Sequence, residues 1–320
     1  MQDRRGPTGS AIIAGSGAPK WPHGVKCPDV DATTRMALLE QIFVAFDTET
    51  TGLSPVTDRV VEIAGIAFKA DGSEIAAFEQ LVDPQIPIPP ALTQIHGITD
   101  SMVAGKPAID DVLPAFVSFV ESFVLVAHNA PYDVAMLAMP ALRLARRAGP
   151  RAGPAGNIVL DTCALARTVL PGSPSYRLRT LAARLGIPEA RPHRAMSDVA
   201  TCKELFLRIL HTCGPGIDLD GLIRLNRTEL YLGPPREEVF QRLCAGAGPR
   251  LSSLRDAVLT GVPIAIRYRG GTKGDAPRLV TPITVMVQAN HAYLVAQCHL
   301  DQGLKNFRLD LISAVQSAPA

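Results

Sequence analysis

The chain of 320 residues lacks the sequence features that would place it in a membrane or outside the cell. No apolar run approaches the roughly 18 residues that a membrane-spanning helix needs. The apolar run 11–14 is also too short for the core of a signal peptide. The six cysteines show no C-x-x-C spacing, so we expect reduced core or surface thiols in a cytosolic protein.

Lysine and acidic residues are scarce in one long part of the chain. Residues 143–194 contain ten arginines, no lysine and only two acidic residues, a formal charge of +8. Residues 29–140 carry sixteen acidic against four basic residues, a formal charge of −12, which the net +2 of the whole chain hides. Arginines that gather on one face bind phosphate groups. Ordinary solvated arginines would have the same sequence, so both interpretations stay open.

Two carboxylates, Asp47 and Glu49, follow the apolar stretch 42–46. The stretch predicts a core strand, and the period-two alternation of a strand sends both side chains to one face. Like charges this close repel each other and lose solvation, so a fold that tolerates them usually has a cation between them. The pair therefore predicts a divalent-metal site, although two solvated carboxylates at a strand end remain an alternative.

Two later segments supply further polar groups. The first is an apolar strand that leads into a helix with Asp133 in its first turn, where the helix dipole favours a carboxylate. In the second, His193 precedes a helix that we expect to begin near Ala195, and Asp198 lies about one turn inside it. Taken singly, Asp133 could serve only the helix dipole, and His193 could be a surface or capping residue. Together with the first pair, the segments indicate one cleft with four carboxylates and one imidazole.

The three motifs resemble those of the DEDDh exonuclease family, which includes the DnaQ-like epsilon proofreading subunits of bacterial replicative polymerases. Secondary features at 60–63, 96–99 and 160–162 are similar too, and the resemblance covers about residues 41–211. It implies an α/β, ribonuclease-H-like mixed sheet with helices on both faces, in agreement with the predicted order of strands and helices. The motifs that carry the resemblance are Asp47-x-Glu49, His128-Asn129-x-x-Tyr132-Asp133 and His193-x-x-x-x-Asp198.

This resemblance implies a nuclease that uses two divalent ions. Oxygen-only ligands suit Mg²⁺ or Mn²⁺ rather than zinc. In the family pattern Asp47 bridges the two ions, Glu49 and Asp198 complete one site, and Asp133 holds the other largely through water. His193 is the general base, because an imidazole with an ordinary pKa of about 6.5 can take a proton from the attacking water.

The resemblance also implies contacts with the terminal nucleotide. A turn after the first carboxylate pair offers backbone donors and an apolar wedge. A histidine approaches the same end of the strand, and an asparagine reaches a phosphate or a base edge. A histidine satisfied within its own loop is the alternative for His96. Tyr132 stands where many relatives carry Phe, and its hydroxyl could meet nucleic acid or solvent. The residues expected to contact substrate are Thr50, Thr51, Gly52, Leu53, His96 and Asn129.

The length of the chain predicts more than one domain. We expect a flexible tail at 1–28, the exonuclease domain at 29–211, a polar connector at 212–250 and a second domain at 251–320. The last segment has four or five short apolar stretches separated by glycine-containing turns. This pattern is typical of a small, strongly bent β-sheet or barrel.

The last segment resembles the WYL domain of bacterial regulators and nuclease-associated proteins. Ala292 replaces the tryptophan that gives the domain its name, and Leu311 replaces a commonly basic residue. Arg267, Arg278 and Arg308 are retained. They could form a pocket for a nucleotide or single-stranded DNA, and a docking barrel without a ligand is the alternative. The stretches that carry the resemblance are 264–268, 278–282, 293–296 and 307–312.

The sequence therefore predicts a metal-dependent 3'-5' exonuclease that acts on single-stranded or frayed DNA ends. We expect it in the bacterial cytosol or nucleoid, without a membrane partner, in proofreading or repair alongside a polymerase or repair protein. An RNA exonuclease is one alternative, since nothing in the sequence reports on the 2'-hydroxyl. The other alternative is a nucleic-acid-sensing or scaffolding protein that chiefly binds ends.

Overall fold

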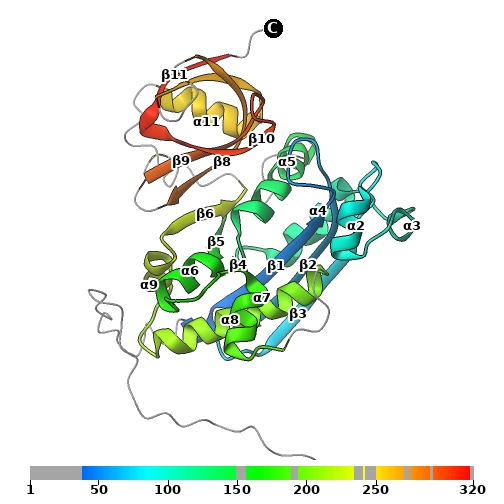
Figure 1. The fold of residues 1–320 in the computed structure, drawn as a ribbon, viewed down its shortest axis with the longest axis vertical. Coiled ribbons are helices and arrows are strands. Elements are labelled where there is room, and N and C mark those ends of the chain that lie inside the picture. The colour runs from blue at the N-terminus through cyan, green and yellow to red at the C-terminus, as the bar shows by residue number, and fades with distance from the viewer. Residues whose placement is uncertain are drawn as a thin grey trace, which may run out of the picture.

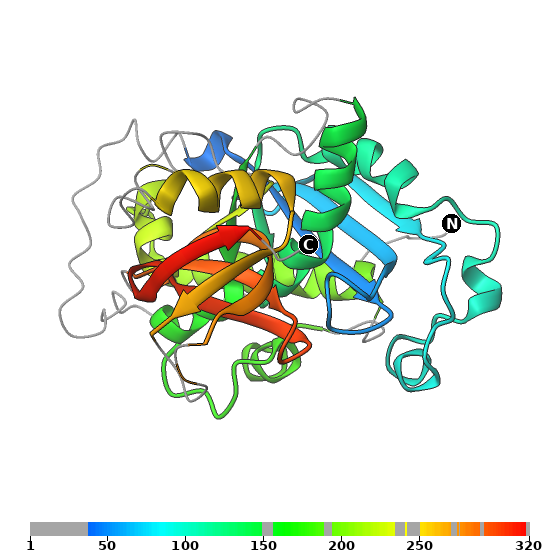
Figure 2. The same ribbon diagram turned by 90° about the horizontal axis from the view of Figure 1, so that it is seen from above.

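The computed structural model shows a larger α/β body and a smaller β-rich body that lie side by side (Figures 1 and 2). The predicted tail, His193 and much of the predicted connector lie outside the described residues. Within the described residues, no helix is both long and apolar enough to cross a membrane. The described residues are 38–148, 156–188, 194–233, 241, 250–269, 274, 276–288 and 291–317.

The larger body is built on a mixed sheet in the order β3-β2-β1-β4-β5. The strands β1 to β3 form antiparallel pairs, whereas β4 runs parallel to both β1 and β5. The ribonuclease-H-like mixed sheet predicted from the sequence is therefore confirmed. The strands are β1 (Ile42–Thr50), β2 (Val60–Lys69), β3 (Glu74–Leu81), β4 (Val124–Ala127) and β5 (Asn157–Asp161).

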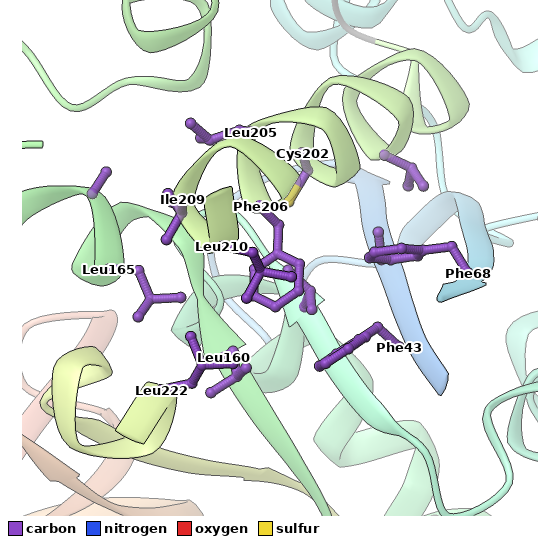
Figure 3. Packing of buried hydrophobic residues seen from close by; sticks show 14 of the residues in the cluster. Phe43, Phe68, Leu160, Leu165, Cys202, Leu205, Phe206, Ile209, Leu210 and Leu222 are labelled. Carbon is purple, nitrogen blue, oxygen red and sulfur yellow. The ribbon is translucent and has the colours of Figure 1, made fainter. Parts of the chain in front are cut away.

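Helices cover both faces of this sheet, because alternate residues of β1 are apolar on both sides. Phe43 packs against Phe206 of α8, with ring centroids 5.0 Å apart, in the core shown in Figure 3. Phe46 points the other way and meets Phe116 of α4 at 6.1 Å, in the core that also contains the buried side of α5. The helices are α2 (Pro90–His96), α3 (Asp100–Val103), α4 (Ile109–Val120), α5 (Pro131–Ala148), α6 (Thr162–Val169), α7 (Leu178–Leu185), α8 (Ala195–Cys213) and α9 (Leu219–Asn226).

The smaller body is a strongly bent antiparallel sheet with α11 packed against it (Figure 1). β8 is the central strand and pairs with both β7 and β9, while β10 and β11 extend the two sides. Leu254 and Val258 of α11 are buried among the apolar residues of these strands. This confirms the predicted β-rich, barrel-like C-terminal part. Its elements are α11 (Arg250–Thr260), β7 (Ile264–Tyr268), β8 (Arg278–Gln288), β9 (His291–Cys298), β10 (Gly303–Arg308), η2 (Leu309–Leu311) and β11 (Ile312–Ser317).

One strand joins the two bodies into a continuous sheet. β6 (Thr228–Leu232) pairs with β5 on one side and with β8 on the other. Ile283 of β8 packs against Ala135 and Ala138 of α5, so the bent sheet also rests on the helix that carries Asp133. Part of the segment predicted as a polar connector thus forms α9, which packs in the core on the α8 side, and β6, which packs in the core on the α4 side.

Candidate metal centre and active site

Strand β1 and helix α8 bring three carboxylates together. Asp47 and Glu49 are two residues apart on β1 and share the face covered by α8, as the strand period predicts. Asp198 lies in the first turn of α8. One carboxylate oxygen from each of the three residues lies within 4.8 Å of the others, and all three side chains are half-buried. Such a set of oxygen donors fits a hard divalent cation.

The electrostatics of these carboxylates favour a cation. Burial raises the pKa of Asp47 well above its ordinary value, and the negative charges of Asp133, Glu49 and Asp198 raise it further. Burial raises the pKa of Glu49 to about 8, with Asp198 as the next largest cause. Without a cation the site therefore retains protons near neutral pH. A bound divalent ion would replace these protons and relieve the repulsion.

Asp133 stands apart from the three carboxylates and is held from the other side of β1. It is buried in the first turn of α5, and its Oδ1 accepts hydrogen bonds from the backbone N of Thr48 at 3.0 Å and from Thr48 Oγ1 at 2.7 Å. Burial raises the pKa of Asp133 to about 7, although the hydrogen bonds from Thr48 oppose the rise. The structure thus brings all four predicted carboxylates to the end of β1, three of them as one close group.

The turn after β1 is held by hydrogen bonds within the protein. Thr50 Oγ1 donates to the carbonyl of Gly52 at 2.8 Å, and the Tyr132 hydroxyl donates to the same carbonyl at 2.9 Å. Thr51 exchanges hydrogen bonds with Arg59 through its backbone N and its Oγ1. The Tyr132 hydroxyl therefore bonds inside the protein, whereas the sequence suggests nucleic acid or solvent as its partner. The expected nucleotide contacts of this turn stay a prediction.

Leu53 and His96 differ in their exposure to a substrate. Leu53 is 76% exposed, as an apolar wedge must be. His96 is buried, and its Nδ1 accepts the backbone N–H of Ile98 at 3.0 Å across the left-handed Gly97. This bond fits the alternative of a histidine that structures its own loop. Contact of His96 with nucleic acid remains a prediction.

The turn before α5 is tied to the start of α6. Asn129 is exposed and has a positive φ of 65°, and its backbone N donates to Asp161 Oδ1 at 2.9 Å. Asp161 also caps α6 by accepting from the backbone N of Cys163. His128 is enclosed beside this turn, where Thr162 and the Tyr176 carbonyl bond its two ring nitrogens and burial lowers its pKa to about 4. These bonds hold the turn before α5 in place, and the Asn129 side chain is exposed at that turn. Contact of Asn129 with nucleic acid remains a prediction.

A buried ion pair beside the carboxylates was missed by the sequence reasoning. Glu62 of β2 lies directly across from Glu49 in the β1–β2 pairing, and its side chain is fully buried. Arg194, the residue before α8, pairs with it. The only signal in the sequence was the resemblance of the segment around Glu62 to the family, which assigned no role to this residue.

The arginine-rich part of the chain is spread over several elements. Arg143 forms a two-pronged salt bridge with Asp110, and Arg147 donates to the carbonyl of the same residue. Arg167 stacks over the Tyr176 ring at 4.7 Å. These three arginines therefore have partners within the protein, which favours the interpretation as ordinary surface side chains at their positions.

Two arginines of the C-terminal body contact Tyr268. Arg278 is only 8% exposed and lies 5.8 Å from the centre of the Tyr268 ring. The Tyr268 hydroxyl accepts from the backbone N of Arg308, whose side chain pairs with Asp310. Among the described residues, the buried Nε of Arg278 has no hydrogen-bond partner. Arg267 lies exposed on β7. Arg278 thus meets Tyr268 through its guanidinium group and Arg308 meets it through its backbone N, while Arg267 precedes Tyr268 on β7.

Comparisons with known sequences agree with this architecture. The sequence model described as Exonuclease matches residues 44–206, and the WYL domain model matches residues 249–317. The DNA polymerase III subunit epsilon of Treponema pallidum is 40% identical over 170 residues, which cover 52% of this chain and 76% of that protein. A DNA polymerase III subunit epsilon-like protein of Rhodobacter capsulatus is 43% identical over 173 residues, 52% of this chain and 23% of that protein.

Other relatives are much longer than the shared part. The PolC-type DNA polymerase III of Caldanaerobacter subterraneus is 39% identical over 174 residues, which are 54% of this chain but only 12% of that polymerase.

Among solved structures, exonuclease X in complex with 5' overhanging duplex DNA matches with 30% identity and a TM-score of 0.46. That match covers 57% of this chain and 99% of exonuclease X.

Proposed function

Because the chain belongs to the exonuclease family and carries a WYL domain at its C-terminal end, we propose that it is a metal-dependent 3'-5' exonuclease. It hydrolyses phosphodiester bonds at the 3' ends of single-stranded or frayed DNA. The observation that carries the proposal is the group of Asp47, Glu49 and Asp198 within 4.8 Å, with the buried Asp133 beside it.

The donor set fits two divalent metal ions. Asp47, Glu49 and Asp198 would hold one ion, and Asp47 would share a second ion with Asp133. All four donors are carboxylates, which suit Mg²⁺ or Mn²⁺. When bound, such ions supply Lewis-acid stabilisation of the charge that develops on the phosphate and on the leaving 3' oxygen.

The chain's own residues supply orientation and proton transfer. Asp133 is fixed by its two hydrogen bonds from Thr48, so its position does not depend on the substrate. The exposed Leu53 meets the terminal base, while the backbone of the turn before it donates to the terminal nucleotide. We assign the general base to His193, which follows from the family motif and would take the proton of the attacking water.

DNA is the proposed substrate because the relatives with this domain are DNA polymerase III proteins by name. A polymerase or a repair protein is the corresponding proposed partner, and the cytosol or nucleoid is the proposed location. The phosphate backbone supplies most of the affinity of such complexes. Activity should therefore fall steeply as the salt concentration rises.

The test is degradation of labelled single strands with Mg²⁺ or Mn²⁺, using DNA and RNA strands blocked at the 3' or the 5' end. We expect release of mononucleotides from DNA with a free 3' end. Asp47→Asn should abolish release, while the exposed Asp71→Asn, the same change outside the centre, should not. Equal activity of Asp47→Asn and the parent, or degradation only from 5' ends, would contradict the proposal. Faster degradation of RNA would select the RNA alternative.

A second candidate function is supported by the buried, unpartnered Nε of Arg278. We propose that Arg278 and Arg308 bind phosphate groups of single-stranded DNA or of a nucleotide beside the Tyr268 ring. Fluorescence anisotropy of a labelled single strand in EDTA measures this binding without cleavage. Arg278→Ala combined with Arg308→Ala should weaken it, whereas the exposed Arg224→Ala should not. Unchanged affinity of the double variant would leave the C-terminal body as a docking module.

A further inference from the structure

A fifth carboxylate lies next to the candidate metal centre. Glu62 is the cross-strand partner of Glu49 in the antiparallel pairing of β1 and β2. Its negative charge contributes to raising the pKa of both Asp47 and Glu49. Like charges directly opposite each other destabilise a strand pair. A fully buried glutamate at this position therefore needs a strong partner.

Arg194 is that partner, and it saturates the carboxylate. Its Nε lies 3.1 Å from both Glu62 oxygens, and its Nη2 donates to Oε1 as well. The backbone N–H of Ala195 donates to Oε2 at 2.9 Å. Both oxygens of Glu62 are thus occupied by a planar, two-pronged pair of the kind that only arginine forms. Arg194 also lies 3.9 Å from Glu79 on β3.

The same contacts hold the start of α8. Ala195 is the first residue of this helix, and its N–H is one of the four that have no partner within a helix. The preceding residue, Arg194, provides no side-chain cap to the helix. Glu62 instead takes the Ala195 N–H, and this anchors the first turn of α8 to β2. Asp198 lies in that turn and belongs to the group of three carboxylates.

We propose that Glu62 and Arg194 are positioning residues for the metal centre. Their ion pair fixes the first turn of α8 so that Asp198 faces Asp47 and Glu49. It also occupies Glu62, so that this fifth carboxylate does not act as an additional ligand and distort the site. This proposal rests on the proposed metal-dependent function, but it concerns metal affinity rather than turnover.

The test compares conservative variants with a matched ion pair elsewhere on α8. Glu62→Gln removes the charge but keeps the shape, and Arg194→Lys keeps the charge but loses the two-pronged geometry. Lys203→Met is the control, because Lys203 ties the same helix to Glu74 of β3 and its side chain is only 9% exposed. Mn²⁺ affinity is measured by calorimetric titration of each full-length variant, and its thermal midpoint is measured in EDTA.

We expect Glu62→Gln and Arg194→Lys to weaken Mn²⁺ binding by about 10- to 100-fold, as the loss of groups that orient metal ligands does. Lys203→Met should lower the thermal midpoint but leave Mn²⁺ affinity within about twofold of the parent, because its ion pair is more than one turn beyond Asp198. The Glu62→Gln and Arg194→Lys double variant should bind Mn²⁺ about as weakly as the worse single variant, since both changes break one interaction.

Two outcomes would overturn the proposal in different ways. Parent-like Mn²⁺ affinity in both single variants, with only a lower thermal midpoint, would show that the pair is structural. In that case Mn²⁺-dependent cleavage by the parent would leave the proposed exonuclease intact. A parent that neither binds Mn²⁺ nor cleaves DNA would remove the proposed function and the positioning role together.

Discussion

The carboxylates at the end of β1 should make the stability of the metal-free protein depend on pH in an unusual direction. Burial and neighbouring charge raise the pKa of Glu49 from its ordinary 4.5 to about 8, and burial raises that of Asp133 from 3.8 to about 7. Between the ordinary and the raised values, the folded state keeps protons that the unfolded state has released. The free energy of unfolding should therefore fall as pH rises through this window.

The size of the fall follows from the change at Glu49. One pH unit of difference in pKa corresponds to about 1.4 kcal/mol, so the rise from 4.5 to about 8 corresponds to at most about 5 kcal/mol. Water reaches part of this half-buried side chain and screens the repulsion, which leaves about 2 kcal/mol as the expected loss. For a domain of this size the thermal midpoint would drop by about 5 °C.

A bound divalent ion should reverse this dependence, because the ion favours the ionised carboxylates. The assay is the thermal midpoint in EDTA and in excess Mn²⁺ at about pH 6 and about pH 8. We expect the thermal midpoint in EDTA to fall as pH rises. The rise of the midpoint on adding Mn²⁺ should be larger at the higher pH. Calorimetric titration at about pH 7, in buffers with different ionisation enthalpies, should show release of at least about one proton on binding.

Glu49→Gln is the control, because its amide does not titrate. The variant should lose the largest identified part of the fall in thermal midpoint with pH. A midpoint in EDTA that is flat or rises from about pH 6 to about pH 8 would refute the reasoning. So would Mn²⁺ binding without proton release. Either result would mean that the carboxylates are ionised in the metal-free protein.

Three further changes test the packing around the site. Tyr132→Phe removes the hydroxyl that holds the turn after β1 and should lower the free energy of unfolding by about 1 kcal/mol in urea. Asn226→Ala should cost about 2 kcal/mol in the same assay, because it leaves two buried backbone groups at β5 and β6 without partners; a loss below that of Tyr132→Phe would contradict this. Ile283→Asp places a charge between β8 and α5 and should lower the free energy of unfolding by about 2 kcal/mol or more, which corresponds to a drop of about 5 °C or more in the thermal midpoint. The exposed Ile75→Asp should not lower the midpoint.

The parts of the site that depend on local geometry could be predicted from sequence. Strand alternation alone places Asp47 and Glu49 on one face, and the structure has them there. The helix predicted to begin near Ala195 does begin there, with Asp198 in its first turn. Helix and strand periods are properties of a few consecutive residues, so they need no information about the rest of the chain.

The parts that depend on distant contacts could not be predicted. Arg194 and Glu62 are 132 residues apart in the chain, and nothing near either residue indicates the other. Strand β6 lies in a segment that looked like a polar connector, because its burial arises only when β5 and β8 pair with its two edges. The sequence likewise left the partner of the Tyr132 hydroxyl undecided, and that partner proved to be a carbonyl 80 residues away.

By itself, the sequence determined the kind of protein this is: an exonuclease-family domain with its four carboxylates in order, followed by a WYL domain. These features reside in residue types and short spacings. The tertiary structure alone decided that the two domains share one sheet, that β8 rests on the helix of Asp133, and that a fifth carboxylate is neutralised beside the centre. The physical reason is that burial and pairing between distant segments set the energy of a charge, and neither exists until the chain has folded.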